Sequence, residues 1–390
     1  MDEKLSKHKF VIIGADNLNT LGVLRSLSEA GISPYIILST DIGSNFVRNS
    51  KWAKNIIFSP SIKENYEILV SKFGGQENKP FVFTTDDANE QMLDENYDEL
   101  KDCFFFYNAG KQGQVSKYMS KDAQCDLAQE IGLKTAPYEV VNLGELPQKI
   151  DYPIITKTLN PNMPGWKKDV FICYNENELK EAYTTMISPK LLLQEYIEKK
   201  NEMPIHGFSC NNGQSVFLAY YSLYYRMEKD NFGFYNYYKP MRDSKLYELI
   251  KKMIGTIGYS GCFEVEFLVD NKDELDFLEI NLRSSMRMYA CTYGGINLPF
   301  LWAKSMLENN IDFDSIQPKK EFFSAMYEPA DYAQYVATKK LGYMRWLNDL
   351  RKADLKFLYN KNDKRPAFKY WTKAIRNMVK YKLKFGRKND

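Results

Sequence analysis

Residues 254–287 read IGTIGYSGCFEVEFLVDNKDELDFLEINLRSSMR, and this stretch carries most of what can be predicted about the fold. Two apolar runs, 262–269 and 275–280, flank the polar segment 270–274. Apolar runs on either side of a short polar turn are typical of a β-hairpin. If the hairpin folds symmetrically between Lys272 and Asp273, Glu266 lies opposite Glu279.

The same register places Glu264 opposite Asn281, and strand alternation puts both on the face that carries Glu266 and Glu279. Facing carboxylates repel each other and destabilise a hairpin. A divalent cation would reverse that effect, since Mg²⁺ takes hard oxygen ligands. The alternative is a solvated acidic face on an edge hairpin, and these residues alone leave both interpretations open. The opposite face is apolar and predicts packing on a core: Phe263, Val265 and Phe267.

Composition limits the classes of protein that the chain can represent. Its 390 residues, 44% hydrophobic and 26% charged, suit two or three globular domains. No apolar run reaches the roughly 18 residues of a membrane span, and the N-terminus leads straight into a strand pattern without a signal peptide. Six cysteines without a CxxC pair suggest reduced thiols in a cytoplasmic protein. Only two histidines are present, which argues against zinc sites and Ser–His or Cys–His catalysis.

The first part of the chain, 9–115, alternates between strand and helix patterns. Strands are expected at 9–14, 34–38, 55–58, 81–84 and 104–107, and helices at 18–30, 63–73 and 87–100. This alternation predicts an open, doubly wound α/β sheet. The loop 14–22 does not match GxGxxG, and Asn17 and Asn19 in it are suited to cap the next helix. Asp86 and Asp87 follow a strand at the ligand-binding edge of such a sheet, where they would hold a cationic amine or cap a helix.

The pattern changes near residue 116. A helix is expected at 120–131, with Lys121 in its first turn, where a cation opposes the helix dipole. A strand follows at 152–157 with Lys157 near its end, then a basic Gly/Pro loop at 158–169 that contains Lys168. Further strands are expected at 170–173 and 191–197, with a helix at 176–185.

The order of these pieces resembles the ATP-grasp carboxylate–amine ligases. V-E-F, followed thirteen residues later by E-I-N and then R, resembles their metal-binding hairpin, and YPIITK and LLLQEYI resemble their phosphate-binding and adenine-binding strands. The resemblance implies an α/β and α+β chain, with an N-terminal open parallel sheet followed by a two-subdomain ATP-grasp fold. The expected domains are a substrate domain at 1–115, the ATP-grasp domain at 116–315, and a C-terminal extension at 316–390 with a basic amphipathic helix.

The resemblance also implies ATP with Mg²⁺ or Mn²⁺ and a set of binding residues. By position, Glu266 and Glu279 would bind metal together with Asn281, and Glu279 would bridge two ions. Catalysis would fall to Lys157 and Arg283, with Arg283 meeting the reacting phosphoryl and acyl oxygens. The implied nucleotide-binding residues are Lys121, Lys157, Lys168, Gln194, Glu195, Tyr196, Ile197 and Glu202.

Within these ligases the chain is most similar to D-aspartate ligase-like proteins of bacterial cell-wall synthesis, through RSLSEAG at 25–31, IGYSG at 257–261 and GGINL at 294–298. It departs from the Ddl type, which carries Arg two positions before the first metal carboxylate, where this chain has Glu264. The resemblance implies amide formation through an acyl phosphate, joining an amino acid such as D-aspartate to a cell-envelope precursor. Two alternatives stay open: a non-catalytic nucleotide-binding module, and a kinase that acts without ligation.

The C-terminal segment is strongly basic. Residues 334–390 hold 17 Lys and Arg against 4 Asp and Glu, a net charge of +13 in a chain whose total is +3. From Pro366 onward, apolar side chains follow helical spacing: Phe368, Trp371, Ala374, Ile375, Met378, Val379 and Leu383. A basic amphipathic helix suits an anionic membrane surface, which would place a cytoplasmic enzyme at the inner face of the cell membrane. The alternative is that the stripe packs on the enzyme body; nucleic acid is not expected as a partner.

Overall fold

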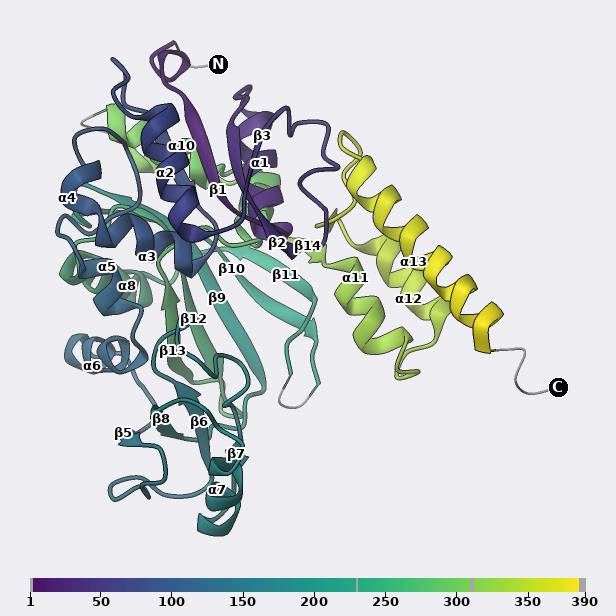
Figure 1. Cartoon of the computed structure of the whole chain (residues 1–390). Helices are drawn as coiled ribbons and strands as arrows, with labels where there is room; N and C mark the ends of the chain where they lie inside the picture. The colour runs from purple at the N-terminus through teal and green to yellow at the C-terminus, as the bar shows by residue number, and fades with distance from the viewer. Residues whose placement is uncertain (1–2, 229–230, 309–311, 386–390) are drawn as a thin grey trace.

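A computed structural model describes residues 3–228, 231–308 and 312–385 (Figure 1). The chain begins with a short turn, η1 (Leu5–Lys7), and a parallel sheet in the order β3-β2-β1-β4. Its strands are β1 (Phe10–Asp16), β2 (Tyr35–Gly43), β3 (Asn55–Ser59) and β4 (Phe81–Thr84). The helices of this part are α1 (Leu18–Glu29), α2 (Ile62–Phe73), α3 (Asp87–Glu95) and α4 (Tyr97–Leu100). The predicted N-terminal open parallel sheet is therefore confirmed.

Two details of that prediction are wrong. The expected strand at 104–107 makes only isolated bridges at its edges, pairing Phe105 with Phe81 and Asn108 with Ser260. The expected helix at 87–100 is interrupted at Asn96, whose side-chain amide donates to the carbonyl of Met92 at 2.8 Å and takes the place of a helical backbone bond.

Two short helices, α5 (Gln114–Tyr118) and α6 (Lys121–Ile131), lead to a small antiparallel sheet in the order β5-β8-β6-β7. Its elements are β5 (Tyr138–Asn142), β6 (Ile154–Thr158), β7 (Ile172–Cys173), α7 (Glu176–Tyr183) and β8 (Lys190–Glu195). Leu191 and Leu193 of β8 pack with Leu179 of α7, so one face of this sheet is covered. The other face carries Lys157 and Gln194 together with the apolar Ile155 and Leu192.

The central sheet has seven strands in the order β13-β12-β9-β10-β11-β14-β15. These are β9 (Asn201–Cys210), β10 (Ser215–Arg226), β11 (Tyr235–Pro240), β12 (Gly261–Val269), β13 (Leu275–Asn281), β14 (Phe323–Met326) and β15 (Leu355–Lys356), with α8 (Ser244–Ile257), α9 (Met288–Gly294), α10 (Leu298–Leu307) and η2 (Phe313–Ser315). The buried indole of Trp302 on α10 contacts Phe83 of β4 and Tyr107 at centroid distances of 5.3 and 4.7 Å. One core therefore joins the N-terminal sheet to the central sheet.

The hairpin of β12 and β13 has the predicted register where it matters for function. Glu266 pairs with Glu279, and Glu264 pairs with Asn281. Beyond Glu266 the register shifts by one residue, so that Phe267 pairs with Phe277. This β-bulge lets Phe277 and Ile280, three positions apart, both face the core. The turn is therefore not symmetric, although the carboxylate face is as expected.

The C-terminal segment adds β14 and β15 to the central sheet, and the helices between and after these two strands form an arm at one side of the molecule (Figure 1). The arm comprises α11 (Glu328–Asp331), η3 (Tyr332–Val336), α12 (Tyr343–Lys352) and α13 (Arg365–Phe385). No helix in the described ranges has the length and apolar character needed to cross a bilayer.

The predicted stripe on α13 divides into two parts. Trp371 packs against Tyr332 and Trp346, whereas Phe368 and Ile375 are 65% and 56% exposed. Ala374 is half-buried. The remaining positions of the apolar stripe and the basic positions after residue 376 lie outside the described side chains: Met378, Val379, Lys380, Lys382, Leu383, Lys384, Arg387 and Lys388.

A buried ion pair fixes the arm to the N-terminal domain. The guanidinium of Arg25 on α1 lies 3.2 Å from the carboxylate of Asp363, and both side chains are fully buried. Arg25 also donates to the carbonyls of Phe357 and Leu358 at 2.6 and 2.9 Å. Asp363 in turn accepts from the hydroxyl of Ser50 at 2.8 Å. Each charge is satisfied only while the two segments stay together.

We predict that Asp363→Ala lowers the free energy of unfolding by about 3–5 kcal/mol, because it leaves the guanidinium of Arg25 buried without its partner. Urea denaturation followed by tryptophan fluorescence measures the change. Glu67→Ala is the matched control, since it removes an exposed pair with Lys63 and should cost about 0.5 kcal/mol or less. Equal effects of the two substitutions would contradict the role given to the buried pair.

Candidate active site

The predicted metal-binding residues meet on one face of β12 and β13. The amide Nδ2 of Asn281 lies 3.1 Å from Oε1 of Glu266 and 3.3 Å from Oε1 of Glu279. One amide group therefore lies between two carboxylates that would otherwise repel each other. Burial raises the pKa of Glu266 well above its ordinary value, and the neighbouring Glu264 carboxylate raises it further. Burial and the neighbouring Glu264 carboxylate therefore both disfavour the charged form of Glu266.

Lys121 provides the compensating cation from another part of the chain. It is the first residue of α6, and its ammonium pairs with the carboxylate of Glu279. Although burial by itself favours the neutral carboxyl, Lys121 lowers the pKa of Glu279 to about 2. The indole of Trp166 lies over the same ammonium at 5.3 Å. A cation in the first turn of a helix is unfavourable, and here the carboxylate of Glu279 compensates the charge of Lys121.

Lys157 reaches the same region from β6. Alternation along this strand turns Ile154 into the small-sheet core and Lys157 to the opposite face, where its ammonium donates to Oε1 of Gln194 at 2.8 Å. Burial lowers the pKa of Lys157 to about 8, and repulsion from Lys121 contributes further. The two ammonium groups form a positive pair beside the acidic hairpin, which is the charge pattern needed to bind phosphate oxygens.

The basic loop 159–168 lies over this pair. The carboxylate of Asp169 anchors its end by accepting from the backbone of Ile187 and Ser188 at 3.0 and 2.7 Å. Asn162 reaches across to donate to Gln91 of α3 at 2.5 Å. Lys168 is exposed. The loop therefore touches the N-terminal domain while Trp166 covers Lys121.

The predicted adenine-binding residues lie at the end of β8. Gln194 and Glu195 are its last two residues, and Tyr196 and Ile197 follow it. The backbone N–H groups of Glu195 and Tyr196 donate to the carbonyls of Pro137 and Pro153. Gln194 is held by Lys157 and by the carbonyl of Ala136.

Glu202, the predicted ribose ligand, lies on β9 and is almost fully buried. Its carboxylate accepts from the hydroxyl of Tyr224 at 2.7 Å and from Lys199 at 2.5 Å. Tyr224 in turn accepts from Arg287 at 3.1 Å. A chain of polar contacts therefore connects the predicted nucleotide pocket with the acidic hairpin.

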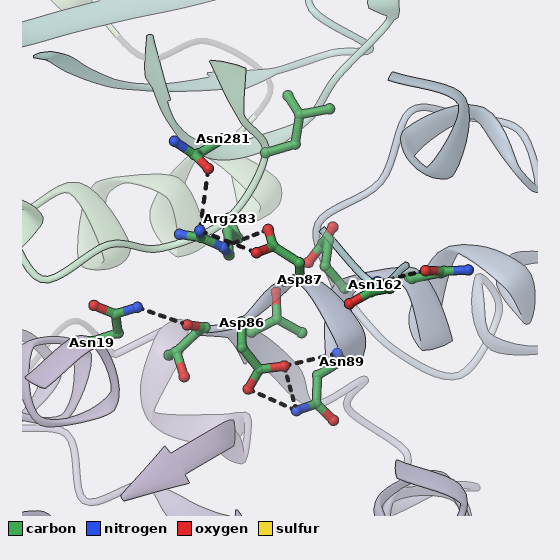
Figure 2. Close-up of polar contacts among 12 residues, drawn as sticks. Asn19, Asp86, Asp87, Asn89, Asn162, Asn281 and Arg283 are labelled. Atoms are coloured by element: carbon green, nitrogen blue, oxygen red, sulfur yellow. Dashed lines mark hydrogen bonds and ion pairs between the residues drawn. The ribbon is translucent and has the colours of Figure 1, made fainter. Parts of the chain in front are cut away.

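The N-terminal part of the chain contributes Asp87, which the sequence indicates, together with Asp86, as a residue that would hold a cationic amine or cap a helix. Arg283 donates to both carboxylate oxygens of Asp87, at 2.7 and 3.2 Å, and to Oδ1 of Asn281 at 3.1 Å (Figure 2). The signal for Asp87 was its place directly after β4, but the sequence alone does not separate its role from that of Asp86. Figure 2 shows that Asp86 turns away to Asn89.

The donor set fits a hard divalent cation. Among the described residues no group of three His, Cys, Asp or Glu side chains is placed to hold a metal. The oxygen donors that face each other here are the carboxylates of Glu266 and Glu279, whereas the amide oxygen of Asn281 accepts from Arg283. Mg²⁺ commonly takes only one or two protein carboxylates and completes its shell with water and substrate phosphates. The residues present therefore suit Mg²⁺ better than a metal that requires a full protein cage.

Together, the sheet topology and the arrangement of this site define the ATP-grasp fold. Comparison with solved structures agrees. An N5-carboxyaminoimidazole synthetase from Staphylococcus aureus superposes with a TM-score of 0.62 over 85% of each chain at 16% identity. An L-amino acid ligase from Bacillus licheniformis gives 0.61 over 81% of this chain and 79% of the ligase at 14% identity. A biotin carboxylase from Campylobacter jejuni, solved as a β-γ-ATP complex, gives 0.60 over 81% and 74% at 20% identity.

Sequence comparison is more limited. No family model matches the chain. An N5-carboxyaminoimidazole ribonucleotide synthase from Staphylococcus aureus (strain COL) is 26% identical over 156 residues, which cover 38% of this chain and 40% of the synthase. The chain therefore matches less than half the length of this curated relative. At these identities the solved neighbours show the fold alone.

We predict that Lys157 loses its charge as the pH rises through about 8, well below the ordinary lysine value of 10.5. The cause is burial together with the nearby ammonium of Lys121. NMR of protein labelled with ¹³C-lysine, with Lys157→Arg for assignment, measures the titration. Gln194→Glu should raise the pKa, because it places a carboxylate where the amide oxygen now lies 2.8 Å from the ammonium. Titration of Lys157 together with exposed lysines would contradict this environment.

Proposed function

We propose that this chain is an ATP-dependent carboxylate–amine ligase that forms an amide through an acyl phosphate and releases ADP and phosphate. The observation that carries the proposal is the meeting of Glu266, Glu279 and Asn281 with the cation of Lys121, brought from a different subdomain. Arg283 stands beside the same amide. The ATP-grasp fold supports the proposal, as does its similarity to the L-amino acid ligase from Bacillus licheniformis.

In this proposal, Lys121 and Lys157 bind the ATP phosphates and Lys168 joins them from the loop 159–168. Residues 194–197 line the adenine site, and Glu202 lies by the ribose. Glu266, Glu279 and Asn281 would hold Mg²⁺, which neutralises phosphate charge when bound. Two structures of similar fold support these assignments: a biotin carboxylase domain from Hydrogenobacter thermophilus in complex with MgADP, and a carboxyaminoimidazole ribonucleotide synthase complexed with ATP.

The difficulty of the first step is that one anion attacks another. A carboxylate oxygen attacks the γ-phosphorus, and the bond to the ADP oxygen breaks. Arg283 and Lys157 stabilise the negative charge that remains on the transferred group. In the second step the amine nitrogen attacks the acyl carbon, and phosphate leaves with the electron pair of the C–O bond. Neither reaction step needs a histidine, which agrees with the presence of only two histidines in the chain.

For the substrates, we propose an amino acid such as D-aspartate, joined to a cell-envelope precursor at the inner face of the membrane. The support is the resemblance to D-aspartate ligase-like proteins and a groove of about 540 Å³ on the C-terminal arm. Apolar side chains of Leu350, Phe368, Trp371 and Ile375 line this groove. Exposed cations flank it on α13: Lys369, Lys373 and Arg376. Apolar surface with a basic border is complementary to an anionic bilayer.

We predict that Glu279→Gln abolishes ADP release while the protein stays folded. Loss of this charge from a phosphoryl-transfer site should cost several kcal/mol, more than about a hundredfold in rate. The assay measures ADP with a panel of L- and D-amino acids as carboxylate and amine, with and without hydroxylamine. Hydroxamate formation reports an acyl phosphate and separates a ligase from a kinase.

Glu274→Gln is the matched control, because Glu274 is an exposed glutamate in the turn of the same hairpin and pairs with Lys134. It should keep nearly full activity. Comparable ADP release by the Glu279 and Glu274 variants would remove the acidic hairpin from the mechanism. ADP release that never yields hydroxamate would favour a kinase.

We predict that the protein sediments with vesicles of phosphatidylglycerol and phosphatidylcholine at low salt, but not with phosphatidylcholine alone. Each Lys or Arg near an anionic surface contributes about 1 kcal/mol, and salt screens it. The variant Phe368→Ser/Ile375→Ser should lose binding, because it removes the exposed apolar pair. Ile187→Ser, at a 59% exposed isoleucine elsewhere, is the control. If the wild-type protein stays in the supernatant with both kinds of vesicle, the proposal that the C-terminal arm binds an anionic membrane is wrong.

A further inference from the structure

Asp87 differs from the other acidic groups near the site. It is the first residue of α3, yet the helix is already capped by Asp86, which accepts from the backbone N–H of Asn89 at 2.9 Å. Asp86 also accepts from the side-chain amide of Asn89 at 2.8 and 2.9 Å. The carboxylate of Asp87 is therefore not needed for the helix and turns to Arg283 instead (Figure 2).

The position of Asp87 is fixed by contacts between the domains. The backbone N–H of Ser284 donates to the carbonyl of Thr84 at 3.3 Å. Asn19 of α1 accepts from the N–H of Met286 at 3.0 Å and donates to the carbonyl of Thr85 at 3.1 Å. The carboxyl ends of β1 and β4 thus hold the segment that follows β13. Asp87 faces the reaction centre because the N-terminal sheet docks there.

Asp87 also has capacity for a further partner. Its side chain is 21% exposed and that of Arg283 is 16% exposed. Arg283 occupies one acceptor position on each carboxylate oxygen, and an ionised carboxylate offers about four such positions. The contact of Asn162 with Gln91, one turn further along α3, brings the basic loop to the same place. A small ligand bound here would lie between Arg283, α3 and the loop.

We propose that Asp87 receives the amine substrate, an inference that rests on the proposed ligase function. An amine is largely protonated at neutral pH and must lose a proton before it attacks. Asp87 attracts the ammonium and accepts that proton; the nitrogen then forms its bond to the acyl carbon, phosphate leaves with the C–O electron pair, and the second N–H proton goes to the leaving phosphate. Glu266 and Glu279 are assigned to the cation, and Glu264 is taken by Arg287 and Ser285. Asp87 is the carboxylate in contact with Arg283, which meets the acyl phosphate.

The test separates the two half-reactions in the full-length protein. Hydroxylamine is a neutral nucleophile at pH 7.5 and does not need a carboxylate to bind an ammonium group. Asp87→Asn keeps an oxygen for Arg283, so hydroxamate formation should stay within about threefold of wild type. Amide formation with the best amino acid of the panel should fall by about a hundredfold or more, as for loss of a general base. The loss should appear in KM for the amine and should shrink as the pH rises and the amine deprotonates.

Asp87→Glu should restore part of the amide formation, and Asp98→Asn, at an exposed aspartate of α4, should leave both half-reactions unchanged. If Asp87→Asn reduces hydroxamate and amide formation equally, Asp87 only orients Arg283 and the proposal fails. If amide formation stays at the wild-type level, it also fails. If wild type itself gives no hydroxamate, the proposed function fails and this assignment fails with it. A drop in melting temperature for Asp87→Asn without a pH-dependent recovery would also count against it.

Discussion

The structure depends on how it handles two carboxylates that face each other in one hairpin. Glu266 and Glu279 are paired by strand register, which by itself destabilises the sheet. The amide of Asn281 lies between them, and Lys121 is brought from α6 to Glu279. The contact with Lys121 spans 158 residues of sequence, so the acidic pair is compensated only when the fold is complete. The fold thus holds one cation and two anions close together at fixed positions.

Polar contacts also hold the N-terminal sheet against the segment that follows the acidic hairpin. The carboxyl ends of β1 and β4 contact the segment after β13 through backbone groups and Asn19, and Arg283 meets Asp87 at that junction. In open parallel sheets this edge is where ligands bind. Here the edge is closed against the acidic hairpin, so the place where a substrate would enter is lined by both domains. The buried pair of Arg25 and Asp363 fixes the opposite side of α1 to the C-terminal arm.

The sequence predicts the acidic face of the hairpin, but other features of the site depend on tertiary contacts that the sequence does not show. Strand alternation was sufficient to place Glu266 opposite Glu279, because the two faces of the hairpin differ so strongly in polarity. Strand alternation does not predict the bulge after Glu266, because the bulge depends on which of Phe277 and Leu278 fits the core. Asp86 and Asp87 have equal propensity to cap a helix, and only the position of Arg283 decides between them. The roles of all the predicted functional residues remain predictions, and those of Lys121, Lys157 and Lys168 rest on the resemblance to ATP-grasp ligases.

Glu264 is the third carboxylate on this face of the hairpin. It lies beside Glu266 on β12, yet Ser285 donates to it at 2.8 Å, Arg287 donates at 3.4 Å, and His206 lies 3.0 Å away. Burial alone would favour its neutral form, but Arg287 and His206 lower the pKa of Glu264 below the ordinary value. For Glu266, burial and the charge of Glu264 act in the opposite direction. Arg287 also lies 3.8 Å from Glu266, and Lys121 pairs with Glu279. Each carboxylate of this row therefore has a cation of the protein beside it, and the contact of Glu266 is the longest of the three.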